Sequence, residues 1–255
     1  MNDTIKTLIN HRSIRHYSDK SIADDVLQEI LTSATRGSTT GNMQLYSIIV
    51  TKDKQMKQQI APMHFNQAAV LEAPVILTFC ADFNRFIRWC EQRNAHHGFN
   101  NIQCLMWAIV DALIAAQNAA IAAEAHNLGI CYMGTVTYNI KPLSKIYNLP
   151  KYVVPVACIT LGHPAEPGML SDRLPLEAVV HQETYHNYSS EDIDRLYAEK
   201  EALPLTKQLL EENQMENLAK IFAEKRYTKQ DNEHFAKKLL EFLQEQDFLP
   251  AQSGM

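Results

Sequence analysis

The feature that most constrains the fold of this chain is a long apolar segment, residues 104–128. Its length and hydropathy would suit a helix that crosses a membrane. Polar side chains nevertheless recur along it: Asp111, Gln117, Asn118, Glu124 and His126. A charged group near the centre of a bilayer costs about 2.5 kcal/mol or more. We therefore expect no membrane span, but a helix buried in a large core or at a subunit interface, where its alanines let other helices approach closely.

The rest of the first 185 residues alternates between helix and strand patterns. Residues 24–36 carry apolar side chains at helical spacing, with aspartates at the start and Gly37 at the end. Three β-branched runs of strand length are continuous enough to be buried on both faces: residues 47–51, 75–80 and 153–161. Further helices are expected at residues 4–10, 54–60, 84–94 and 142–147. The strands are expected to form a central sheet.

Composition limits the class of protein. The 255 residues are 46% hydrophobic and 21% charged, which is enough to bury a large core as one domain with an appendage. A net charge of −5 provides no global attraction for nucleic acid or an acidic membrane. The five cysteines are odd in number and unclustered, which predicts buried thiols rather than a disulfide framework, and the N-terminus lacks an apolar signal core. We expect a cytoplasmic protein.

The character of the chain changes after residue 185. Three highly charged stretches with intermittent apolar side chains at helical spacing follow, at residues 190–200, 207–225 and 228–246, and Pro204 separates the first two. We therefore predict two parts, a core of residues 1–185 and a charged helical C-terminal extension of residues 186–255. The helices of the extension are expected to lie on the surface.

A dense polar cluster stands beside the N-terminus: His11, Arg12, Ser13 and Arg15. Arginine presents a planar fork of donors that binds phosphate or a polar ring edge, so the cluster indicates an anionic partner. The alternative is a solvated basic turn between two helices. No G-x-G-x-x-G follows the first strand, so a Rossmann fold is unsupported, and the histidines lack the spacing of a metal site.

Several short blocks occur in a specific order between residue 4 and about residue 185. They are residues 11–17, residues 38–40 with Gln44, Gln67, and residues 79–85, 116–119, 132–134 and 173–175. In order and spacing they resemble the nitroreductase family, and within it the oxygen-insensitive nitroreductase and NADPH-flavin oxidoreductase group. The resemblance implies an α+β fold, the FMN-dependent nitroreductase fold, with a central mixed sheet flanked by helices. It also implies an intertwined homodimer with two FMN sites at its interface and the segment 104–128 at its centre.

The resemblance assigns the basic cluster to FMN. His11 and Arg173 would hold the phosphate, and Arg12 and Ser13 the phosphate, the ribityl chain or the pyrimidine side. Arg15 would face the N1–O2 edge, where a cation stabilises the reduced anionic flavin. No protein residue is then needed as a catalytic acid or base, because N5 of the flavin is the reactive atom.

The flavin ring is assigned to two other segments by the same resemblance. Gln67 would meet the pyrimidine edge or N5, and the alternative is a surface residue at a helix N-terminus. Gly134 and Thr135 would direct backbone N–H groups toward O4 and N5, since glycine permits close approach of the backbone. Tyr132 and Met133 would line one face of the ring.

The remaining site residues come from two loops. Ser38, Thr39 and Thr40 would lie against the flavin of the other subunit. Ser171 stands where the group usually has a lysine near N1–O2, and Asp172 adds a carboxylate beside it. The flavin pocket is therefore expected to be less positive than in the group.

The function implied is an FMN-dependent NAD(P)H oxidoreductase that reduces nitroaromatics, quinones or flavins by ping-pong hydride transfer through N5. NADPH and NADH both stay open as the donor, because the cations available for a nucleotide phosphate, Lys225, Arg226 and Lys229, depart from the group's usual arginine-rich loop. The extension is expected to wrap the partner subunit, with a direct cofactor role as the alternative. A different class of function is an FMN-binding storage or sensing protein with little turnover, which the change at Ser171 makes conceivable. Small aromatic electron acceptors are the expected partners.

Overall fold

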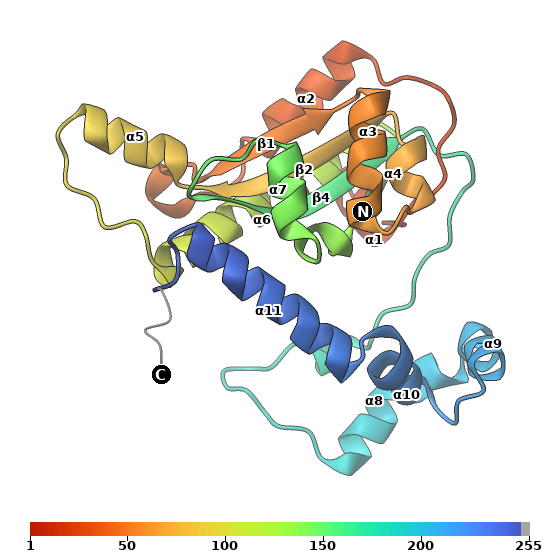
Figure 1. Cartoon of the computed structure of the whole chain (residues 1–255). Helices are drawn as coiled ribbons and strands as arrows, with labels where there is room; N and C mark the ends of the chain where they lie inside the picture. Colours follow the sequence, from red (N-terminus) through yellow and green to blue (C-terminus); the bar gives the residue numbers. More distant parts are fainter. Residues whose placement is uncertain (251–255) are drawn as a thin grey trace. The chain divides into compact units, whose positions relative to one another are not determined.

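A computed structural model describes residues 1–250 of the chain (Figure 1). The chain forms two compact units. The first joins Met1–Met169 to the chain from Phe235 onward, and the second is Leu170–His234. The expected boundary at residue 185 coincides with neither end of the second unit.

A four-stranded sheet organises the first unit. The strands are β1 (Tyr46–Thr51), β2 (Val75–Asp82), β3 (Gly129–Tyr132) and β4 (Val153–Gly162), in the order β1-β2-β4-β3. Neighbouring strands are all antiparallel, so the expected mixed sheet is wrong. Parallel pairing among the described residues is limited to an isolated bridge between Ser13 and Ile130. The α+β class itself is confirmed.

The predicted mixed sheet was wrong because burial of a strand on both faces does not determine whether it runs parallel or antiparallel to its neighbours. Every residue of β2 is buried, and alternate residues face two different parts of the core. Helices cover both faces of this antiparallel sheet, as Figure 1 shows, so its central strands β2 and β4 are almost entirely buried. Continuous apolar runs therefore indicated burial correctly but not strand direction.

One face of the sheet is covered by α2 (Asp24–Ala34) and α6 (Ile102–Ala125). The helix α6 is the expected buried helix, and its alanines pack against α2 and the sheet. Among the described residues it is the one helix long and apolar enough to cross a membrane, yet half of its most apolar window is buried inside the protein. Four large apolar side chains stay exposed along it: Ile102, Met106, Val110 and Leu113.

The opposite face is covered by short helices: α3 (Lys54–Ile60), η2 (Ala61–His64), α4 (Ala68–Glu72), η3 (Gly134–Thr137) and α7 (Ile140–Ile146). The expected helices at residues 54–60 and 142–147 are confirmed as α3 and α7. Two of these elements, η2 and η3, carry residues that matter for the site below.

Three further elements of the chain complete the first unit: α1 (Asp3–Ile9), η1 (Thr40–Asn42) and α5 (Asn84–Gln92). The C-terminal part of α11 (Lys229–Glu245) also belongs to it. Phe242, Leu243 and Phe248 are buried in the part of the core that includes residues of α6. The expectation that the last helix lies on the surface is therefore wrong at its C-terminal end.

The second unit is built from η4 (Leu176–Ala178), α8 (Ser190–Ala202), α9 (Pro204–Asn213), α10 (Leu218–Lys220) and the π-helix η5 (Ile221–Arg226). A capping box begins α8, and Pro204 occupies the first turn of α9, as its sequence position suggested. The expected single helix at residues 207–225 is instead broken. Gln214 takes a left-handed conformation that ends α9, and the Asn217 side chain caps α10.

Candidate functional site

The N-terminal basic cluster lies along β3. Ser13 forms the parallel bridge with Ile130, and the Ile14 N–H donates to the Ile130 carbonyl at 2.8 Å. Gly129 makes this approach possible, because a Cβ at that position would stand 2.5 Å from Cγ1 of Ile14. The segment that carries the cluster is therefore fixed to the strand that leads to Gly134.

Tyr17 fixes the other end of the segment. Its buried hydroxyl lies 2.7 Å from the Ile14 carbonyl oxygen and 3.1 Å from the Thr160 carbonyl oxygen. Burial raises the pKa of the Tyr17 phenol, so it stays protonated and can donate. The basic cluster is thus held at both ends by buried groups, which a solvated turn would not be.

The polar side chains of the cluster differ in their surroundings. His11 Nδ1 lies 2.6 Å from Glu124 Oε1, which leaves Nε2 as the ring nitrogen that could meet a phosphate. Arg12 Nε is buried without a hydrogen-bond partner in the described structure. Arg15 is exposed. Burial raises the pKa of the Cys131 thiol, and the positive charge of Arg15 partly opposes that rise. The Arg15 guanidinium therefore lies near Cys131, at the end of β3.

A surface hollow of about 310 Å³ opens beside Arg12. It is lined by Thr7, Asn10, Arg12, Ile14, Glu124, Asn127, Leu128, Gly129, Pro164 and Pro167. The hollow therefore brings α1, the basic cluster and the C-terminal end of α6 together.

The loop before η1 is tied to α6 by one carboxylate. Asp111 Oδ1 accepts from the Thr40 N–H at 2.8 Å and from the Thr40 hydroxyl at 3.0 Å, and Oδ2 accepts from the Leu45 N–H at 3.0 Å. Asp111 is only 1% exposed. Ser38 is exposed and Thr39 partly so, which leaves these two side chains available to a second molecule.

The end of β3 presents an open stretch of backbone. Met133 is buried, and its N–H donates to the Cys158 carbonyl at 2.8 Å. Tyr132 is partly exposed, and burial of part of the side chain raises the pKa of its phenol to about 12. A Cβ placed on Gly134 would meet no heavy atom within 4 Å. A planar ring therefore has room to approach the backbone at Gly134.

The residue that contacts Thr135 was not predicted from the sequence. His64, at the end of η2, is 1% exposed, and its Nδ1 lies 2.8 Å from the Thr135 hydroxyl oxygen. Its Nε2 is buried with no partner in the described structure. Burial lowers the pKa of His64 to about 4, so the ring is neutral at pH 7. Only its position three residues before Gln67 could have drawn attention to it.

Gln67 follows His64 through an unusual turn. Phe65 and Asn66 both have left-handed backbones, with φ of 55° and 53°. The Gln67 N–H donates to the His64 carbonyl at 3.2 Å, and Gln67 itself is the exposed N-cap of α4. No cap hydrogen bond is made by its side chain. Both interpretations of Gln67, helix N-terminus and ligand contact, are compatible with this geometry.

Ser171 and Arg173 belong to the second unit. The Arg173 guanidinium is exposed and donates to the Asp172 carbonyl at 2.9 Å. The Asp172 carboxylate forms an ion pair with Lys200 at 2.6 Å. The added carboxylate is therefore paired with a lysine 28 positions along the chain.

A model of the nitroreductase family matches residues 8–163 of the chain. The protein belongs to the nitroreductase family. The match includes every site residue expected from the sequence except Ser171 and Arg173. Membership confirms the fold and makes the protein an oxidoreductase.

Individual relatives agree with this assignment. The chain is 39% identical to FMN reductase [NAD(P)H] from Bacillus subtilis, over 73% of this chain and 76% of the relative. It is 36% identical to the oxygen-insensitive NADPH nitroreductase of Salmonella typhimurium, over 72% and 75% of the two chains. A crystal structure of a candidate oxidoreductase from Bacteroides fragilis superimposes with a TM-score of 0.94 at 47% identity, covering 98% of this chain and 100% of that one.

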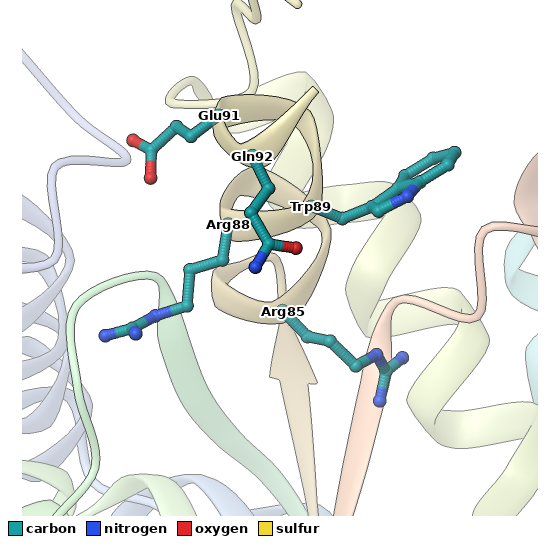
Figure 2. A pocket seen from close by; sticks show the side chains of 5 residues that line it. All are labelled: Arg85, Arg88, Trp89, Glu91 and Gln92. Atoms are coloured by element: carbon teal, nitrogen blue, oxygen red, sulfur yellow. The ribbon is translucent and has the colours of Figure 1, made fainter. Parts of the chain in front are cut away.

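A second hollow of this nitroreductase, about 520 Å³, lies along α5. Its lining residues are Arg85, Arg88, Trp89, Glu91 and Gln92. Figure 2 shows that these side chains leave one helix in different directions, with Arg88 and Trp89 pointing to opposite sides. This hollow is lined by residues of one helix, whereas groups from three segments meet near the end of β3.

Metal and thiol chemistry find no support among residues 1–250. No group of three or more His, Cys, Asp or Glu side chains that could hold a metal ion occurs there. All five cysteines are free and buried. Burial raises the pKa of Cys131, the cysteine on β3, so its sulfur stays a thiol that packs rather than reacts.

Proposed function

We propose that this protein is an FMN-dependent NAD(P)H oxidoreductase that reduces nitroaromatics, quinones or flavins, with donor and acceptor binding in alternation at one place. The observation that carries the proposal is the bridge between the basic cluster and β3, which brings cationic side chains to the strand that ends at the open backbone of Gly134. Family membership supplies the class of reaction.

The residues present fit FMN on two observations. Arg12 Nε is a buried cationic donor without a partner, which is unfavourable unless a ligand oxygen satisfies it. The space beside Gly134 accepts a flat ring, which a larger residue would obstruct. Bound FMN supplies two-electron hydride chemistry at N5.

Each part of the cofactor then has a protein group assigned to it. His11 Nε2 would bind the phosphate, and Arg12 and Ser13 would contribute on the phosphate, ribityl or pyrimidine side. That Arg173 also binds the phosphate is implied by the family resemblance and stays a prediction. Arg15 holds a positive charge where the N1–O2 edge becomes negative, which is electrostatic stabilisation by a preformed charge.

The ring itself is held by backbone and amide groups. Gly134 and Thr135 would direct backbone N–H groups toward O4 and N5, and Gln67 would meet the pyrimidine edge or N5. Met133 fixes the strand end through its hydrogen bond with Cys158, so these donors come from a rigid element.

We further propose that the protein is a homodimer built on α6. Ile102, Met106, Val110 and Leu113 are spaced to share one face of α6 and are each 43–50% exposed in the single chain. A contiguous apolar stripe of this kind marks a protein interface. Ser38 and Thr39 would meet the flavin of the other subunit, and the extension of residues 186–255 would wrap that subunit.

The alternative of a storage or sensing protein is less well supported. It rested on the loss of the group's usual lysine at Ser171 and on the added Asp172, and the Asp172 carboxylate is paired with Lys200. The free, buried cysteines are compatible with the reducing cytoplasm, where we place the enzyme.

The test begins with the absorption spectrum and the sedimentation of the purified protein. A yellow dimer with about one FMN per subunit is expected. Stopped-flow reduction by NADPH and by NADH then shows which donor reduces the flavin. A protein that binds FMN but is reduced by neither donor would overturn the oxidoreductase assignment in favour of storage, and an FMN-loaded monomer would overturn the dimer.

A further inference from the structure

His64 joins two loops that are 71 positions apart in the chain. Its Nδ1 lies 2.8 Å from Thr135 Oγ1, in the turn after β3, while its own backbone begins the turn that ends at Gln67. Asn139 adds a second tie, because its side-chain amide donates to the Met63 carbonyl at 3.1 Å. The two loops therefore meet through polar contacts made by one buried ring and one amide.

The turn between His64 and Gln67 needs such an anchor. Phe65 and Asn66 are consecutive left-handed residues, a conformation that is unfavourable for a bulky side chain such as phenylalanine. A turn of this kind persists when its surroundings hold it in place. The buried His64 ring fixes one end, and the helix α4 begins at the other.

The chemistry of the ring suits a neutral link rather than a charge. His64 is neutral at pH 7, because burial lowers its pKa to about 4. A neutral imidazole either donates to the Thr135 hydroxyl or accepts from it, and its second nitrogen, Nε2, is buried and unpartnered. The contact thus orients the Thr135 side chain without adding a charge.

We propose that His64 is a positioning residue, which holds Thr135 and the Gln67 turn in a fixed relation so that both meet the flavin ring as one preformed surface. This inference rests on the proposed function, in which Gln67 and the backbone of residues 134–135 contact the ring. Holding two ligand-binding segments before the ligand arrives raises affinity, because their ordering is not lost on binding.

The experiment compares FMN affinity of the apoprotein and the FMN midpoint potential in four variants: His64→Asn, His64→Leu, Thr135→Val and the His64→Leu/Thr135→Val double variant. Asparagine keeps a polar atom at the position of Nδ1, whereas leucine removes it. Valine keeps the shape and backbone of Thr135 but not its hydroxyl. A matched control is His126→Leu, since His126 pairs with Glu29 at the surface.

His64→Leu and Thr135→Val should each weaken FMN binding about three- to tenfold, as expected for one lost hydrogen bond. The double variant should bind FMN no more weakly than the weaker-binding single variant, because both changes remove the same contact. Each should lower the midpoint potential, since misplaced N–H donors stabilise the reduced flavin less. His64→Asn should restore affinity and potential, and His126→Leu should change neither.

Other outcomes separate the two levels of the argument. A wild-type protein that fails to bind FMN would overturn the proposed function. If the wild-type protein binds FMN, two results would overturn only the role of His64. One is a double variant whose loss of FMN affinity equals the sum of the two single losses, and the other is an unchanged FMN affinity in Thr135→Val. Should His64→Leu fail to fold, Thr135→Val and His64→Asn still decide: a loss in the first and none in the second supports the role, and any other result rejects it.

Discussion

The link between Asp111 and the loop that carries Ser38 to Thr40 gives the sharpest test of the fold. Asp111 accepts three hydrogen bonds, two from Thr40 and one from the Leu45 N–H. We predict that Asp111→Asn lowers the free energy of unfolding by about 2 kcal/mol and Asp111→Ala by about 4 kcal/mol.

The magnitudes follow from where each donor lies. Leu45 is fully buried, so its N–H cannot turn to water when its acceptor is lost. Asparagine keeps an acceptor for both Thr40 groups but turns an NH₂ toward the Leu45 N–H, which strands that donor at a cost of about 1–3 kcal/mol. Alanine removes all three hydrogen bonds, and water can reach only the partly exposed Thr40. The Asp111→Ala variant therefore loses more free energy of unfolding than Asp111→Asn.

Equilibrium urea unfolding of the apoprotein at one protein concentration measures both effects without a contribution from flavin. Gln103→Ala is the matched control, since it alters an exposed side chain on the same helix and should stay within about 0.5 kcal/mol of wild type. An Asp111→Asn variant that is as stable as the wild type, or less stable than Asp111→Ala, would refute the argument. Either result would mean that the carboxylate does not hold the loop.

Three further outcomes are expected. Gly129→Ala should lower stability by about 1–3 kcal/mol and weaken FMN binding, because its Cβ would overlap Ile14; chemical unfolding and flavin titration measure this, and wild-type values would contradict the close approach. Arg173→Ala should weaken FMN binding by about 1.5–3 kcal/mol in a fluorescence titration, and unchanged affinity would remove Arg173 from the phosphate site. His64 has its ordinary pKa of 6.5 when unfolded and about 4 when folded, so only the unfolded state takes up its proton between these values. The free energy of unfolding should therefore fall, by up to about 1.4 kcal/mol per pH unit, as pH drops from 6.5 to 4, and a wild-type profile that matches His64→Asn would contradict this.

The sequence predicted the features that depend on local pattern. The apolar segment that became α6 and the β-branched run that became β2 were recognisable because burial leaves a periodic or continuous signal along the chain. The basic cluster was recognisable because its residues are adjacent. The site's family followed from the order of short blocks rather than from any single residue.

Features that depend on distant contacts were not predictable in the same way. The antiparallel direction of β2 and β4 is set by chain connections, and a fully buried strand looks the same in either direction. His64 is a lone histidine whose partner, Thr135, lies 71 positions away. Asp172 lies in a loop and is paired with Lys200 of α8, which no local pattern around Asp172 reveals.

The return of the chain from the second unit to the first has a consequence for biosynthesis. Residues 1–169 leave the ribosome well before Phe242, Leu243 and Phe248, because the whole of Leu170–His234 is made in between. At about 5–20 residues per second, synthesis of that segment takes roughly 3 to 13 s.

During this interval the apolar surface against which the C-terminal residues pack is uncovered. It includes Phe83, Ile87 and Leu105, all fully or almost fully buried in the finished protein. A nascent chain with such a surface is open to aggregation until its last residues arrive. If translation stops before residue 235, the released chain has a complete sheet, but the core residues that the C-terminal segment covers are exposed to solvent. Chaperones, rather than flavin binding, then determine whether that chain aggregates.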